Sequence, residues 1–107
     1  MFQVNLVETE GLIESQRIVK EPEEIEKLKK ACEISDKAFE YMIKNIKKGM
    51  TEKQIAFELE NYMVSNGADG IAFPSIVASG ENSSMPHAVP TDRVIKENDI
   101  ILFDFGA

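Results

Sequence analysis

Asp104 is a carboxylate near the end of an apolar stretch that runs from Ile100 to Phe105. A charged aspartate between two phenylalanines is costly to bury unless a cation or hydrogen-bond donors compensate its charge. A divalent metal ion is one such solution. The plainer alternative is a strand-end aspartate that accepts backbone hydrogen bonds in a turn, and the residue alone favours it. Asp104 is therefore a candidate metal ligand whose structural alternative stays open.

His87 is the only histidine, so the chain cannot build a histidine-based metal cluster by itself. It lies between Glu81 and Thr91, a segment rich in asparagine, serine and proline rather than an apolar helix face. A loop histidine is well placed to bind or to exchange protons, but it can equally be a solvated residue without a role. From the residue itself both interpretations stand.

The composition predicts one small soluble domain, with 43% hydrophobic and 29% charged residues. No stretch approaches the ~20 apolar residues of a membrane span. The net charge is −7, and lysines are spread among glutamates instead of forming the concentrated basic face that nucleic-acid binding requires. We therefore expect neither a nucleic-acid nor a membrane partner.

The cellular compartment is indicated by two further features. The first residues lack the basic region and long apolar core of a signal peptide. The single cysteine, Cys32, excludes an internal disulfide and a thiolate cluster, and it falls on an apolar helical stripe where packing is its expected role. We expect a cytoplasmic protein.

Two helices are predicted before residue 70. Residues 1–19 show no sustained period and form a lead-in segment. Pro22, with acidic neighbours, is typical of a first helical turn, and this helix is expected to end near Gly49. Thr51–Gln54 has capping-box spacing, and the second helix should stop at Asn66-Gly67. The first helix carries an apolar stripe at three- and four-residue steps: Ile25, Leu28, Cys32, Ser35, Phe39, Met42 and Ile46.

Two strands are predicted after the helices. Residues from Ile71 to Gly80 are rich in β-formers, although Pro74 restricts them to a strand edge or start. A polar loop, a turn in which Asn98 takes the left-handed conformation, and a second strand over residues 100–105 follow. The fold class is thus α+β, two helices followed by an antiparallel strand pair, whose open edges need a cover.

The run from Gly80 to Pro90, Gly-Glu-Asn-Ser-Ser-Met-Pro-His-Ala-Val-Pro, together with Ile100 to Ala107, resembles the creatinase/aminopeptidase family of pita-bread metallopeptidases. The similarity is to its Xaa-Pro peptidase branch, aminopeptidase P and prolidase. Arg17 to Ile25 also resembles the family's entry into the first catalytic-domain helix. Methionine aminopeptidases are less similar around the histidine.

This resemblance implies the amino-terminal half of a pita-bread fold, with residues 1–19 as a linker and residues 20–107 as a partial catalytic domain. Asp104 matches the first of five ligands to two divalent metal ions. His87 matches a residue that hydrogen-bonds the substrate or the tetrahedral intermediate. The metals would activate a water that attacks the bond before proline. Oxygen-rich ligation favours hard cations, so manganese is expected first, with cobalt or zinc as alternatives.

The remaining ligands of the family, an aspartate, a histidine and two glutamates, would follow residue 107. We therefore expect a truncated fragment of an Xaa-Pro peptidase acting on proline-containing peptides, inactive alone and without stably bound metal. Asn98, where the family usually has glycine, tolerates the same backbone. The alternatives are a non-catalytic pita-bread module that binds peptides or proteins, and a fragment without function. A lone half could also form a homodimer about a two-fold axis.

Overall fold

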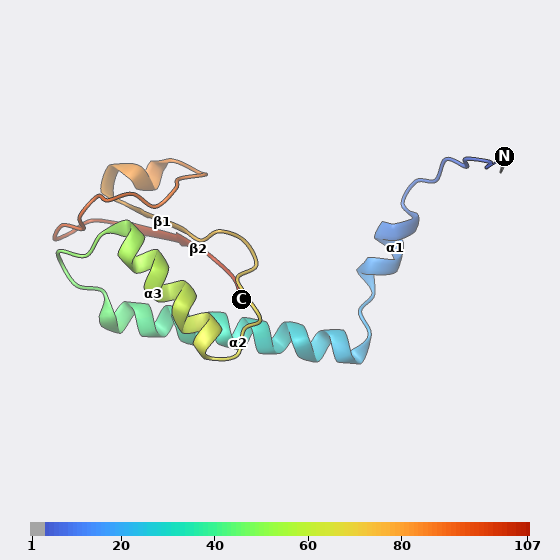
Figure 1. Cartoon of the computed structure of the whole chain (residues 1–107), viewed down its shortest axis with the longest axis horizontal. Coiled ribbons are helices and arrows are strands. Elements are labelled where there is room, and N and C mark those ends of the chain that lie inside the picture. The colour runs from blue at the N-terminus through green and yellow to red at the C-terminus, as the bar shows by residue number, and fades with distance from the viewer. Residues whose placement is uncertain (1–3) are drawn as a thin grey trace.

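The computed structural model describes residues 4–107, which form an α+β structure (Figure 1). The prediction of two long helices followed by an antiparallel strand pair is confirmed. A short helix precedes this arrangement, and a 3₁₀ helix, η1, separates the strands. The elements are α1 (Leu12–Ile18), α2 (Pro22–Asn45), α3 (Glu52–Ser65), β1 (Ile76–Ser79), η1 (Gly80–Ser84) and β2 (Ile101–Asp104).

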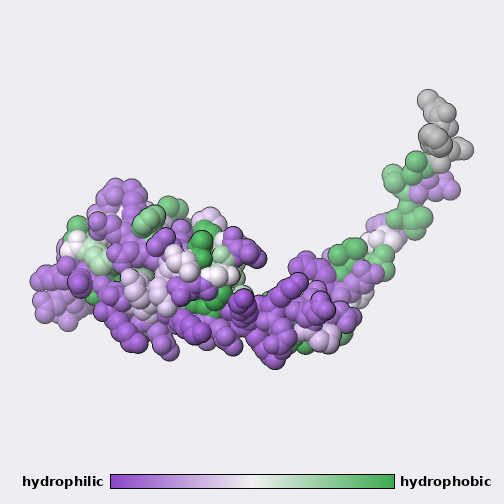
Figure 2. Space-filling model, turned by 60° about the horizontal axis from the view of Figure 1, so that its bottom comes forward, coloured by the Kyte–Doolittle hydropathy of each residue, from purple (hydrophilic) through white to green (hydrophobic). Residues whose placement is uncertain are grey.

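Helix α1 lies on an arm that extends away from the rest of the structure (Figure 1). None of its residues is buried, and apolar side chains interrupt the hydrophilic surface along the arm (Figure 2). The pattern of residues 1–19 did not indicate this helix, because seven residues are too few to establish a period. Residues 1–3 of that segment lie outside the described part of the chain.

Helix α2 begins as predicted, with Pro22 in its first turn. Glu21 and Glu24 form a reciprocal capping box there, which satisfies backbone N–H groups that have no partner within the helix. The helix ends at Asn45, four residues before Gly49, and Ile46 is already extended.

The apolar stripe predicted along α2 is only partly correct. Met42 is fully buried and Ile34 is 7% exposed, but Ile25 and Leu28 remain 42% and 52% exposed. The prediction that Cys32 packs inward is wrong, since it is exposed. Figure 1 shows the reason, because α3 crosses only the carboxyl-terminal part of this long helix. The apolar side chains in the amino-terminal part of α2 are therefore not covered by any described residue.

The core forms where α2, α3 and β1 meet. Met42 of α2, Ile55, Leu59 and Met63 of α3, and Val77 of β1 are all fully buried. Each such side chain contributes roughly 1.5–3 kcal/mol by leaving water. Met42 and Met63 are thus packing residues of this core.

The capping box predicted at the start of α3 is also confirmed. The Thr51 hydroxyl accepts a hydrogen bond from the Gln54 N–H, and the Gln54 amide oxygen accepts one from the Thr51 N–H at 2.9 Å. The helix ends before Asn66-Gly67 as expected, and Gly67 has a φ of 102°. This start fixes the position of Glu52, the first residue of the helix.

The strands pair over four residues each, with Ile76 opposite Asp104 and Ser79 opposite Ile101. The second strand is close to its predicted bounds. The first is shorter, because the stretch from residue 71 to 75 is irregular. Pro74 has no N–H to donate, and the N–H of Ser75 bonds to the Glu60 carboxylate at 3.2 Å instead of to a strand.

The strand pair has two different faces, because successive side chains alternate. Val77 and Phe103 are opposite each other and pack with the helices, so their side is the core face. Ala78 and Asp104 therefore belong to the other side, called here the outer face. Figure 1 shows η1 and the loop that follows it on this side, away from α2 and α3, and η1 contacts both strands.

The long connection between the strands contains both expected and unexpected structure. The polar loop predicted from Glu81 begins with the 3₁₀ helix η1, which the sequence did not indicate. The turn before β2 is as predicted, and Asn98 adopts a left-handed conformation with a φ of 66°. Among residues 4–107, no helix combines the length and apolar character needed to cross a bilayer.

The two strands have no further strand partner in the described residues, and Phe39, Phe103 and Phe105 form a partly exposed aromatic cluster beside them. Because unpaired strand edges promote association, we expect the isolated chain to form a homodimer that covers them. Sedimentation velocity at micromolar concentration would measure this, with circular dichroism to verify folding. A folded monomer over the whole concentration range would contradict it.

Candidate functional site

Asp104 is the last residue of β2 and is exposed on the outer face. Within the described chain its carboxylate accepts no hydrogen bond and forms no ion pair. The structure therefore gives no support to the plainer alternative, in which turn hydrogen bonds hold this aspartate. Its carboxylate is free to bind a cation supplied from elsewhere.

His87 lies in an exposed turn with Pro86, in the loop that follows η1. The next residue, Ala88, is only 6% exposed and donates its N–H to the Met85 carbonyl at 3.2 Å. The backbone around the histidine is thus ordered by packing on one side, while the imidazole faces solvent. This geometry suits a residue that meets a ligand from outside.

His87 and Asp104 do not contact each other, and no ion pair joins them in the part of the chain described. The fold nevertheless places both on the same side of the strand pair, since the histidine loop lies over the outer face and Asp104 belongs to that face. Residues 4–107 contain no group of three or more histidine, cysteine, aspartate or glutamate side chains able to hold a metal ion. The residues present therefore do not fit a dinuclear metal centre by themselves.

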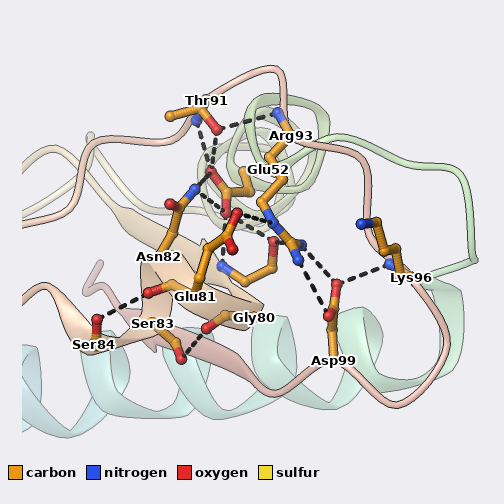
Figure 3. Close-up of polar contacts among 11 residues, drawn as sticks. Glu52, Gly80, Glu81, Asn82, Ser83, Ser84, Thr91, Arg93, Lys96 and Asp99 are labelled. Atoms are coloured by element: carbon orange, nitrogen blue, oxygen red, sulfur yellow. Dashed lines mark hydrogen bonds and ion pairs between the residues drawn. The ribbon is translucent and has the colours of Figure 1, made fainter.

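The main polar feature of the structure is a buried carboxylate, Glu52, in the first turn of α3 (Figure 3). It is 0% exposed. Its Oε1 accepts hydrogen bonds from the Ser79 N–H and hydroxyl at 2.7 and 2.8 Å, and its Oε2 accepts from the Thr91 N–H and hydroxyl at 2.9 and 2.6 Å. The Asn82 amide donates to both oxygens. One carboxylate thus joins α3 to both ends of the loop.

The pKa of Glu52 reflects two opposing effects. Burial raises it, because desolvation disfavours the charged form, but the hydrogen bonds from Thr91 and Ser79 together outweigh burial and lower the pKa from 4.5 to about 2. The carboxylate is therefore charged at neutral pH although it is buried.

The same segment also binds the start of α3 through its backbone. The Thr91 carbonyl accepts from the Lys53 N–H, and the Arg93 carbonyl accepts from the Glu52 N–H, both at 3.1 Å. These N–H groups have no partner within a helix. Residues 91–93 therefore cap α3 at the point where its first side chain holds the loop.

A second polar pair lies next to this carboxylate. Arg93 donates to Asp99 Oδ2 at 2.6 Å and to the Ser79 hydroxyl at 2.7 Å. The hydrogen bond from Arg93 is the main reason why the pKa of Asp99 is lowered to about 2. The Ser79 hydroxyl accepts from Arg93 and donates to Glu52, so one serine links the two charged groups.

Gly80 is the one position where this cluster requires glycine. Its φ is 51°, and a Cβ there would overlap the Arg93 guanidinium and lie 2.9 Å from Asp99 Oδ1. Any other residue would displace Arg93 and strain the backbone. The glycine at the start of the loop motif is thus explained by packing against the ion pair.

Glu52, Arg93 and Asp99 were missed as site residues in the sequence. Glu52 follows a helix cap, where an acidic residue is expected to be exposed and to complement the helix dipole. Its partner Thr91 is 39 residues away, and no local pattern reports such a contact. The sequence signal for this cluster is that Gly80 and Asn82 belong to the run from Gly80 to Pro90 that resembles a known family.

Comparison with known proteins gives consistent results. Residues 26–107 match metallopeptidase family M24. The chain is 43% identical over 98 residues to the Xaa-Pro dipeptidase of Pyrococcus furiosus, covering 92% of this chain and 28% of that protein. It is 44% identical over 102 residues to an uncharacterized peptidase of Bacillus subtilis, covering 95% and 29% respectively.

Solved structures show the same similarity. The X-Pro aminopeptidase of Thermotoga maritima matches with a TM-score of 0.84 and 48% identity, over 89% of this chain and 27% of that one. The Xaa-Pro dipeptidase of Bacillus anthracis matches with a TM-score of 0.87 and 42% identity, over 92% and 28%. This chain therefore spans less than a third of the length of these relatives.

Glu52→Gln should lower the free energy of unfolding at pH 7 by about 2–4 kcal/mol, because an amide nitrogen would face buried donors. The exposed Glu23→Gln, in the first turn of α2, makes the same charge change and should cost less than about 0.5 kcal/mol. Urea denaturation followed by circular dichroism would measure both.

The loss in Glu52→Gln should depend on pH. The folded pKa of Glu52 is about 2 and the ordinary value is 4.5, so the unfolded state takes up the proton first as pH falls. The contribution of the carboxylate is present above pH 4.5 and is lost between pH 4.5 and 2. Equal stability of the Gln variant and the wild type at pH 7 would contradict this assignment.

Proposed function

Because this chain belongs to metallopeptidase family M24, we propose that it is part of the catalytic domain of a dinuclear metal-dependent Xaa-Pro peptidase. That enzyme hydrolyses the peptide bond before proline, and its substrates are proline-containing peptides. The observation that carries the proposal is the placement of Asp104 and the His87 loop on one side of the strand pair. The relatives named Xaa-Pro dipeptidase and X-Pro aminopeptidase support it.

In this proposal Asp104 supplies one metal ligand. Its exposure at a strand end, without a hydrogen-bonded partner among residues 4–107, suits a carboxylate that binds a cation. The cofactors of the whole enzyme are two divalent ions, with manganese first and cobalt or zinc as alternatives, because carboxylate oxygens prefer hard cations. One carboxylate cannot hold two ions, so the other ligands come from outside residues 1–107.

His87 is the proposed catalytic residue of this chain. Its imidazole is exposed, in a turn whose backbone is held by the buried Ala88. Either ring nitrogen can donate a hydrogen bond to a substrate or intermediate oxygen. The histidine binds and orients; it is not a metal ligand.

The proposed domain division is a connecting segment over residues 1–19 and the catalytic part over residues 20–107. The lack of any buried residue in α1, and its position on an arm away from the core, support this division (Figure 1).

The 107-residue chain alone should not release proline from an Xaa-Pro dipeptide in the presence of Mn²⁺, because the described residues do not assemble a metal site. Chromatographic detection of free proline would measure this. Proline release by the pure chain that Asp104→Ala abolishes would overturn the prediction.

A chimera provides the positive test. Residues 26–107, which match the family, would replace the corresponding segment of the Pyrococcus furiosus Xaa-Pro dipeptidase, with which the chain shares 43% identity over 98 residues. We expect Mn²⁺-dependent proline release. His87→Ala should lower kcat by about 10²–10³-fold and leave the metal content unchanged. Asp104→Asn should lower both kcat and the metal content. Metal analysis of each purified variant separates the two roles.

The chimera also tests the alternative of a non-catalytic binding module. A folded, metal-loaded chimera that binds the dipeptide without hydrolysing it would contradict the catalytic proposal. Unchanged kcat in His87→Ala would remove the proposed role of the histidine, and unchanged metal content in Asp104→Asn would remove that of the aspartate.

A further inference from the structure

We propose that Glu52 is a positioning residue for His87, and that its buried carboxylate holds both ends of the loop that carries the histidine. The catalytic meaning of this inference rests on the proposed function. The structural claim concerns this chain alone, and it can fail or succeed independently of peptidase activity.

The geometry of the loop carries the inference. Ser79 lies immediately before η1, Asn82 lies within it, and Thr91 lies four residues after His87, and all three donate hydrogen bonds to the same carboxylate (Figure 3). Both ends of the loop are therefore hydrogen-bonded to a single side chain. Fixing the ends of a closed loop limits the positions that its tip can reach.

The chemistry of the carboxylate makes it suited to this role. Two oxygens receive five donor groups at distances of 2.6–3.3 Å. A charged acceptor forms stronger hydrogen bonds than a neutral one, and only a carboxylate has acceptors at both positions. Glutamine would turn one acceptor into a donor, so either the Ser79 end or the Thr91 end would lose its hydrogen bonds.

The surroundings exclude a simple ion pair as the function of Glu52. The nearby cation, Arg93, directs its guanidinium to Asp99 and to the Ser79 hydroxyl, and its longer ion pair, at 3.9 Å, is with Glu81. The partners of Glu52 are instead the neutral donors of Ser79, Asn82 and Thr91. The hydrogen bonds that Glu52 accepts thus hold the loop and the neighbouring strand end.

The path from Glu52 to the histidine is short. The Met85 N–H donates to the Asn82 carbonyl at 3.1 Å, and the Ala88 N–H donates to the Met85 carbonyl at 3.2 Å. Asn82 is held by the carboxylate through its side chain. A chain of two backbone hydrogen bonds therefore joins the residue bound by Glu52 to the turn that contains His87.

Amide hydrogen exchange of the ¹⁵N-labelled chain would test the inference. The reporters are the Ala88 N–H, in the turn with His87, and the Leu59 N–H, in the buried part of α3. For each amide we compare the exchange rate in Glu52→Gln with that in the wild type. We expect this ratio to be at least about tenfold larger for Ala88 than for Leu59. In the control Glu23→Gln, both rates should stay within about twofold of the wild type.

Two further variants keep the test decisive if Glu52→Gln does not fold. Asn82→Ala removes only the contact from η1. Thr91→Val removes the hydroxyl at the far end of the loop, which donates to Glu52 and accepts from the Arg93 N–H, and keeps the Thr91 N–H donor. Each should increase the exchange of Ala88 by more than that of Leu59, and each should change the imidazole chemical shifts of His87. If Ala88 and Leu59 accelerate equally, Glu52 only stabilises the fold. That result, or unchanged exchange of Ala88, would overturn the inference.

Discussion

A charged carboxylate can be buried only where hydrogen-bond donors replace the water it has lost. The donors for Glu52 come from three segments, namely the end of β1, η1 and Thr91. Glu52 therefore joins the first turn of α3 to all three segments. The apolar core holds α3 against α2 and β1. The carboxylate instead holds η1 and the loop up to Thr91 in place through hydrogen bonds.

The features that could be predicted from the sequence are those fixed by neighbouring residues. Pro22 and its acidic neighbours mark the start of α2, the Thr51–Gln54 pair marks the start of α3, and Asn98 marks the turn before β2. Each depends on a hydrogen bond or a backbone preference within four residues. Local chemistry of this kind is readable without knowledge of the fold.

The features that could not be predicted depend on distant partners. The period along α2 suggested an inward Cys32, but only the arrangement of α3 decides which side of α2 is covered. The strand that was expected from Ile71 begins at Ile76, because a side chain of α3 takes the N–H of Ser75. Likewise, Asp104 and His87 were recognisable as candidates, whereas the residue that holds the histidine loop was not, since its partners are 27 to 39 residues away.

The aromatic cluster beside the strands has a consequence for the order of events during synthesis. Phe39 emerges from the ribosome about sixty residues before Phe103 and Phe105, which contact its ring at centroid distances of 5.8 and 6.3 Å. The N–H of Ala107 then donates to the Ser35 hydroxyl, a contact that spans 72 residues. Local helices can form early, but contacts of such large sequence separation form late. A nascent chain therefore displays the uncovered Phe39 ring until residues 103–105 have been synthesised, and during this interval the ring is most exposed to aggregation or to chaperones.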